Sequence, residues 1–200
     1  MSYDLLLALT LFAFVSSITP GPNNLMLMAS GANFGFRRTL PHLLGVGIGF
    51  TLMIVLVGVG LVQVFDLYPI SHQILKLVSV IYLLWLAWKI ANAATPEGDV
   101  QSEGTPITFI QAALFQWVNP KAWFMAITAI SAYAPQDQGI VMGSLIVAVV
   151  FAVVNLPSIT IWAWMGVQVR RWLGSARRLR IFNVSMAVLL VVSLYPMLMH

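Results

Sequence analysis

Two short runs of residues in this chain of 200 residues could bind a small polar ligand. The first is Pro20-Gly21-Pro22-Asn23-Asn24, where proline and glycine interrupt an apolar stretch and two amides follow. The second is Asn119-Pro120-Lys121, which also lies inside an apolar stretch. Because proline removes a backbone donor and asparagine favours the start of a new helix, each run predicts a broken helix.

The chemistry of these breaks follows from their backbone and side chains. Each break would begin a half-helix whose N-terminus carries partial positive charge and unpaired N–H donors. Lys121 would add a full charge, and Gln116 lies one turn before the second break. Such a site suits an anion or the carboxylate of a zwitterion. The ammonium of a zwitterion would bind the carbonyls that end the first half-helices and the amides of Asn23, Asn24 and Asn119.

Two plainer interpretations stand beside this one. The first break could be a proline kink whose free backbone groups bond to neighbouring helices. The Lys121 side chain could extend so that its ammonium lies at the membrane–water interface. No carboxylate lies deep in any expected helix, which favours a small neutral ligand over a strongly cationic one.

The composition indicates the surroundings of these runs. Hydrophobic residues make up 60% of the chain and charged residues 8%, which leaves too few polar groups to cover a soluble domain. The net charge is +4, but no basic stretch sits on a soluble module, so no nucleic-acid partner is indicated. With no cysteine and three scattered histidines, we expect no metal site, no cofactor and no enzyme active site. The lipid bilayer is the expected solvent.

The pattern along the chain predicts an all-α integral membrane protein with six transmembrane helices. The expected spans are Tyr3–Asn33, Leu40–Val64, Ile74–Ala91, Ile107–Ala134, Ile140–Val167 and Ile181–Met199. Residues 1–94 would form a first three-helix repeat and residues 107–200 a second, inverted one, joined by a polar cytoplasmic linker at 95–106. Helices one and four would be broken near the membrane midplane, which is a pointer to a transporter's binding site.

Positive charge predicts the orientation in the membrane. The loops after helices one, three and five hold eight of the ten cations: Arg37, Arg38, Lys89, Arg170, Arg171, Arg177, Arg178 and Arg180. By the positive-inside rule these loops face the cytoplasm, so both termini are expected on the opposite side of the membrane.

Four further residues are weaker candidates. Asn155 and Pro157 form a third polar kink that would act either as a hinge on the transport path or in simple packing. Gly45 starts a Gly-x-x-x-Gly spacing that permits close helix approach, either within one chain or between the copies of a homodimer. His42 is either an interfacial polar residue or a group for proton transfer.

The motifs resemble the LysE/RhtB family of amino-acid exporters. Thr19-Pro20-Gly21-Pro22-Asn23-Asn24 is similar to that family's helix-one signature, as are Trp85-Leu86-Ala87-Trp88-Lys89 and Asn119-Pro120-Lys121. The resemblance implies export of small neutral amino acids or close derivatives, in the class of cysteine, O-acetylserine, homoserine, threonine or leucine. It also implies coupling to the proton gradient, for which Lys121 and His42 are the titratable candidates. Export of another small anionic or zwitterionic metabolite, a passive pore and a membrane enzyme are the alternatives.

Overall fold

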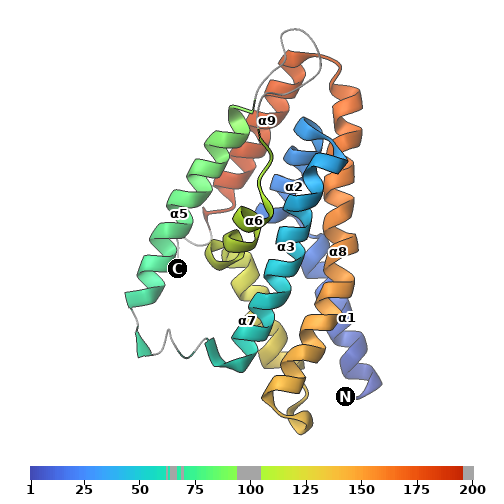
Figure 1. Cartoon of the computed structure of the whole chain (residues 1–200), viewed down its shortest axis with the longest axis vertical. Coiled ribbons are helices and arrows are strands. Elements are labelled where there is room, and N and C mark those ends of the chain that lie inside the picture. Colours follow the sequence, from blue (N-terminus) through green and yellow to red (C-terminus); the bar gives the residue numbers. More distant parts are fainter. Residues whose placement is uncertain (62, 64–66, 69, 94–104, 196–200) are drawn as a thin grey trace.

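The computed structural model describes residues 1–61, 63, 67–68, 70–93 and 105–195, and within these ranges every regular element is helical (Figure 1). The elements are α1 (Tyr3–Ile18), α2 (Pro22–Phe34), α3 (Phe36–Leu56), the π turn η1 (Val57–Leu61), α5 (Ile70–Ala91), α6 (Phe109–Phe115), the 3-10 turn η2 (Gln116–Val118), α7 (Pro120–Tyr133), the 3-10 turn η3 (Gln136–Gln138), α8 (Ile140–Leu173) and α9 (Ala176–Val192).

The helices of the described residues differ in their capacity to cross a membrane. Three are long and apolar enough by themselves, namely α3 with η1, the part of α5 from Gln73, and α8. The bent pair of α1 and α2 brings the number to four if it counts as one span. The chain is therefore an all-helical membrane protein, whereas six spans in two inverted repeats stay a prediction. The predicted linker at 95–106 falls mostly on residues outside the described ranges.

Both helix breaks occur at the predicted motifs. The axis bends by 52° between α1 and α2, where Thr19 ends the first helix and Gly21 precedes the second in extended conformation. In the second case α6 tightens into η2, and Asn119 alone separates η2 from α7. Proline is the first residue of both α2 and α7, a position where its missing N–H costs nothing.

Three helices extend through arginine-containing turns beyond the apolar pattern. α3 begins at Phe36 rather than Leu40, α9 begins at Ala176 rather than Ile181, and α8 continues to Leu173 rather than Val167. The additional turns are rich in arginine, which is polar but forms helices readily, so the helix outlasts its apolar run. Gly174 ends α8 in a left-handed conformation with a φ of 48°.

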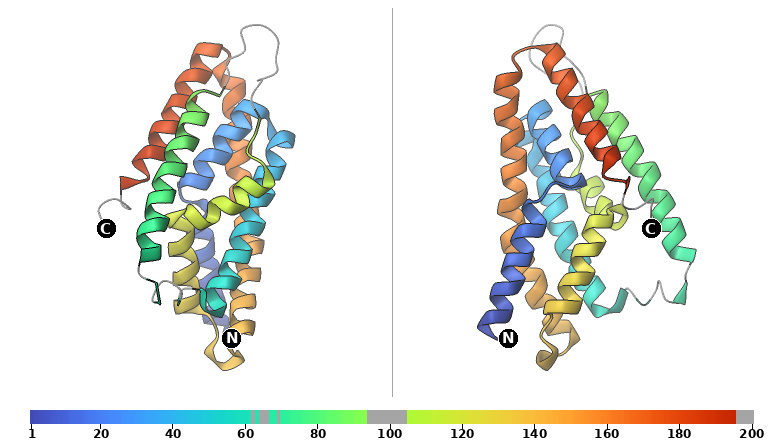
Figure 2. Two further views of the ribbon diagram at one scale, coloured as in Figure 1. Left: turned by 60° about the vertical axis from the view of Figure 1, so that its left-hand side comes forward. Right: turned by 180° about the vertical axis from the view of Figure 1, so that it is seen from behind.

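The closest helix packing joins segments far apart in the sequence. α2 lies along α8, α3 along α6 and α8, and α5 along α9, the last pair side by side in both views of Figure 2. Glycines permit the tightest of these contacts: a Cβ on Gly31 would lie 2.1 Å from the Ala163 carbonyl oxygen, and one on Gly166 would lie 2.0 Å from that of Met28.

Two clusters of buried apolar side chains form the core. One contains Leu27, Leu86 and Phe115 among others and fills the space among α2, α5, α6 and α9. The other contains Leu9 and Phe151 and joins α1, α3, α7 and α8. The two helix breaks lie between these clusters.

The basic residues gather at one end of the molecule. The start of α3, the end of α5 and the turn from α8 to α9 all lie at the upper end of Figure 1. These are the segments that hold Arg37, Arg38, Lys89, Arg170, Arg171, Arg177, Arg178 and Arg180.

Candidate functional site

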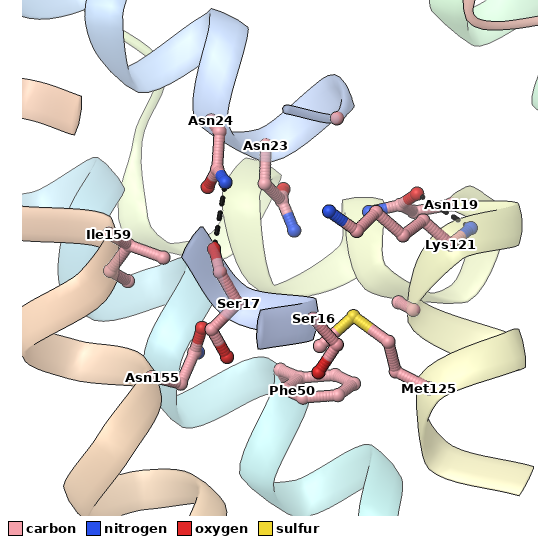
Figure 3. A pocket seen from close by; sticks show the side chains of 12 residues that line it. Ser16, Ser17, Asn23, Asn24, Phe50, Asn119, Lys121, Met125, Asn155 and Ile159 are labelled. Carbon is pink, nitrogen blue, oxygen red and sulfur yellow. Dashed lines mark hydrogen bonds between the residues drawn. The ribbon is translucent and has the colours of Figure 1, made fainter. Parts of the chain in front are cut away.

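A small polar pocket lies where the two breaks meet (Figure 3). It holds about 340 Å³ of empty space, including the part open to solvent. Its lining contains one cation and no carboxylate. The lining residues are Ser16, Ser17, Gly21, Asn23, Asn24, Phe50, Asn119, Lys121, Ala122, Met125, Asn155 and Ile159.

The structure brings most of the predicted ligand-binding residues together. Gly21, Asn23, Asn24, Asn119 and Lys121 line the pocket directly. The other predicted residues are in contact with these or shape the breaks: Gln116 bonds to Asn23, the Pro20 carbonyl accepts from Lys121, and Pro22 and Pro120 begin α2 and α7.

The carbonyls that end α1 have side-chain donors from elsewhere in the chain. The Asn24 amide donates to the carbonyl oxygens of Ser17 and Thr19, both at 2.8 Å. The Trp162 indole N–H, on α8, donates to the Ile18 carbonyl at 3.0 Å. A helix end inside a membrane needs such partners because lipid supplies none.

Lys121 completes this set from the second break. Its Nζ donates to the Thr19 carbonyl at 2.7 Å, to the Thr19 hydroxyl at 2.9 Å and to the Pro20 carbonyl at 3.3 Å. Three donated hydrogen bonds use all three N–H groups of an ammonium, whereas a neutral amine has only two. The geometry thus fits the charged form of Lys121.

These contacts change one expectation about the first break. Its carbonyls were expected to be open to a ligand's ammonium, but protein donors occupy those of Ser17, Ile18, Thr19 and Pro20. Gly21 and Pro22 are buried, whereas Thr19 and Pro20 are exposed on the surface of the chain, where Lys121 satisfies their oxygens.

The second break is satisfied by its own residues. The Asn119 side chain caps α7 by accepting from the Lys121 backbone N–H at 3.1 Å. The Trp123 indole donates to the Trp117 carbonyl at 2.9 Å. At α2, in contrast, Gly21 precedes the helix and no side chain caps it. The start of α2 is therefore the helix end that faces the pocket with its backbone donors uncapped.

A pair of amides joins the two breaks. Asn23 Nδ2 donates to Gln116 Oε1 at 2.8 Å, and Gln116 Nε2 donates back to Asn23 Oδ1 at 3.2 Å. Gln116 is fully buried and also donates to the Ala112 carbonyl, so its position is fixed within its own segment. It holds the first residue after the Pro-Gly-Pro run against the second break.

The weaker candidates divide between the pocket and its surroundings. Asn155 lines the pocket, while α8 runs through Pro157 without interruption. Gly45 lies outside the pocket, and a Cβ there would lie 2.3 Å from the Phe109 carbonyl, so this glycine packs α3 on α6 of the same chain. His42 is fully buried rather than at an exposed interface, and neither ring nitrogen has a partner among the described residues.

Sequence reasoning missed the other walls of the pocket. Phe50, Met125 and Ile159 are apolar residues on apolar helices, so nothing in their type distinguishes them from core. Trp162 is one of seven tryptophans in the chain, and its residue type does not mark it as the donor to the Ile18 carbonyl. Ser17 precedes the Pro-Gly-Pro run by one helical turn, and that spacing was the available signal.

A second polar cluster lies at the basic end. Asn33 and Asn183 exchange amide hydrogen bonds at 2.7 and 2.9 Å, and Arg170 donates to the Asn33 carbonyl at 3.2 Å. The cluster ties α2 to α8 and α9. In the part of the chain that the structure describes, no group of three or more histidine or acidic side chains could hold a metal ion.

A polar pocket between two broken helices, inside an all-helical apolar chain, is an arrangement used by membrane transporters. The chain belongs to the LysE family, since the profile of LysE type translocators matches residues 14–194. It is 31% identical over 194 residues to the cysteine/O-acetylserine efflux proteins of Escherichia coli K12 and Shigella sonnei, with 96% of each chain covered. No solved structure matches it.

Proposed function

We propose that this protein is a secondary-active exporter of small neutral amino acids or close derivatives across the bacterial inner membrane. Its substrates would fall in the class of cysteine, O-acetylserine, homoserine, threonine or leucine. The names of the efflux proteins to which it is similar support this class. The small pocket, with a cation and several amides but no carboxylate, supports a zwitterion over a cationic substrate.

One observation carries the proposal. Lys121, from one break, holds the carbonyls of the other break and also lines the pocket. A substrate carboxylate would be attracted to this ammonium and to the uncapped start of α2. A substrate ammonium would bind the oxygens of the amides Asn23, Asn24 and Asn119, or replace Lys121 at the Thr19 carbonyl.

This exchange suggests how transport could be linked to movement of the breaks. When a substrate carboxylate draws Lys121 toward the pocket, the Pro20 carbonyl loses its described donor and the Thr19 carbonyl keeps only that of Asn24. The first break is then free to rearrange, and release of the substrate returns Lys121 to it. For coupling to the proton gradient, Lys121 and the buried His42 are the candidate groups within the bundle.

The proposed topology keeps six spans. The bent pair of α1 and α2 would form the first span, and α6, η2 and α7 together the fourth. The basic residues at one end would face the cytoplasm, and both termini would then lie in the periplasm. Residues 1–94 and 107–200 would be the inverted repeats. A homodimer would use other surfaces than Gly45, because that glycine already packs on α6.

The test is transport by the purified protein in proteoliposomes loaded with labelled amino acids. We expect saturable efflux of a few small neutral amino acids, acceleration by unlabelled substrate on the opposite side, and stimulation by an imposed proton gradient. Asn23→Ala is the matched control, since it removes the amide pair with Gln116 while leaving the apolar walls intact.

The other outcomes separate the alternatives. Efflux that does not saturate and shows no counterflow would indicate a passive pore. Counterflow with small anions but not with amino acids would indicate a different metabolite. Efflux that ignores the proton gradient would remove the coupling proposal and leave the carrier in place.

A further inference from the structure

The side chain of Asn155 lines the pocket and has no hydrogen-bond partner among the described residues. Asn155 lies near the middle of α8, the longest membrane-spanning helix described, and is 5% exposed. Because an unpaired amide in an apolar surrounding is costly, a buried one facing a cavity points to a ligand that completes it.

A second unpaired group lies on the same pocket. The Ser17 hydroxyl is buried and has no partner among the described residues. Other serines of these helices donate to the carbonyl one turn back: Ser16 bonds to Phe12, and Ser158 bonds to Val154. Ser17 lacks this local bond. In the view of Figure 3, Ser17 and Asn155 lie next to each other, on the side away from Lys121.

The pocket thus has two chemically different ends. Lys121 and Asn23 lie at one end and suit the charged groups that all amino acids share. Asn155 and Ser17 lie at the other end and can both donate and accept hydrogen bonds. The apolar walls are Phe50 and Met125, together with Ile159 on the side of Asn155 (Figure 3). A ligand held by its charged groups would extend its side chain toward Asn155.

We infer that Asn155 and Ser17 form the subsite that recognises the substrate's side chain, and that this subsite selects amino acids carrying a hydrogen-bonding group on a short side chain. The inference rests on the proposed function and deepens it. A hydroxyl or an acyl carbonyl would satisfy both groups, whereas an aliphatic side chain would leave them unpaired. Sites built to hydrogen-bond a substrate reject isosteric analogues that lack the group.

The test compares substrates that differ only in that group. Threonine and valine have the same shape, as do homoserine and norvaline. Initial efflux rates of all four would be measured in proteoliposomes with the wild-type protein, Asn155→Leu, Ser17→Ala and Ser158→Ala. Ser158→Ala is the matched control, since its hydroxyl lies on the same helix but bonds to a carbonyl outside the pocket lining.

We expect the wild-type protein to favour the hydroxyl member of each pair by about tenfold or more. Asn155→Leu should bring the ratio of the two efflux rates in each pair close to one, while valine and norvaline are still transported. Ser17→Ala should reduce the ratio by a smaller factor, and Ser158→Ala should leave it unchanged. Asn155→Thr, which keeps a hydroxyl, should restore part of the preference.

Two results would overturn the inference. One is a wild-type ratio near one in both pairs. The other is an equal fall in the efflux rates of both amino acids of each pair in Asn155→Leu and Ser17→Ala. That result would mean that the two side chains serve packing or bind water. Failure of the wild-type protein to export any amino acid is a different result, because it refutes the proposed function itself. If Asn155→Leu does not reach the membrane, Ser17→Ala alone decides between these outcomes.

Discussion

The two helix breaks look alike in the sequence but obtain their hydrogen bonds in different ways. At the second break the Asn119 side chain caps its own helix, and the Trp123 indole binds the Trp117 carbonyl nearby. At the first break the donors to the Ile18 and Thr19 carbonyls include side chains of α8 and α7, far along the chain. The backbone of the second break is bonded by nearby side chains, whereas the carbonyls of the first break also depend on side chains of distant helices.

This difference assigns different tasks to the two breaks. A break that is satisfied locally can remain in place as a rigid platform while other parts move. A break that is held by distant donors changes when those donors move. The first break is therefore the element that we expect to respond to substrate, and Lys121 is the donor that the substrate can reach from the pocket.

The largest effect is expected from Lys121→Met. Among the described residues, this change removes the donor to the Pro20 carbonyl and one of the two side-chain donors to the Thr19 carbonyl, together with the positive charge of the pocket. Because hydrogen bonds to charged groups are worth about 1.5–3 kcal/mol, efflux should fall by roughly tenfold or more. Initial efflux rates in proteoliposomes would measure the loss.

The matched control is Lys76→Met, which removes the same charge from α5 outside the pocket. It should export at the wild-type rate. If Lys121→Met and Lys76→Met reduce the efflux rate equally, the reduction reflects net charge, and the role proposed for Lys121 is wrong.

The second comparison sets Asn24→Ala against Asn119→Ala. Asn24 is the described donor to the Ser17 carbonyl, so its loss leaves that group unpaired, at about 1–3 kcal/mol. Loss of the Asn119 cap should destabilise the protein by about 1 kcal/mol. The midpoint of thermal unfolding in detergent should therefore drop further for Asn24→Ala. A larger drop in the unfolding midpoint for Asn119→Ala would mean that the first break depends less on its side-chain hydrogen bonds than the second.

A third experiment tests the amide pair that joins the breaks. Asn23→Ala, Gln116→Ala and the double variant form a cycle whose coupling free energy we expect to be about 0.6–1.5 kcal/mol. Thermal unfolding of the four proteins gives this value. Additive losses would show that the two amides act separately.

The smallest effect is expected from Trp162→Phe. This change keeps an aromatic ring but removes the donor to the Ile18 carbonyl, at about 1 kcal/mol. Unfolding in detergent should shift modestly while efflux is retained. Trp164→Phe, an exposed residue on the same helix, serves as the reference and should not shift.

Much of the fold was predictable because the membrane restricts the available structures. Apolar length and the prolines predicted the helical class and both break positions, and both are confirmed. The ends of α3 and α8 were not predictable from hydropathy, since arginine continues a helix beyond the apolar region. The packing partner of Gly45 could not be predicted either, because a glycine spacing does not reveal which helix packs against it.

The site was predictable only where residue type departs from its surroundings. Asn23, Asn119 and Lys121 stand out in an apolar stretch, so the sequence indicated them. Phe50 and Ile159 look like core residues, and only the fold shows that they line the pocket. The direction of the Lys121 side chain could not be predicted at all, because it depends on how two distant segments meet.

The packing of α2 on α8 also bears on how the protein is made. When the first half of the chain enters the bilayer, α8 and α9 do not yet exist. Asn33 therefore enters before its partner Asn183, and Asn23 before its partner Gln116. The early helices have to remain in the membrane with polar groups that await later ones. Although the sequence divides into two proposed repeats, neither would be a folding unit, and a cut in the linker would yield two fragments that need each other during insertion.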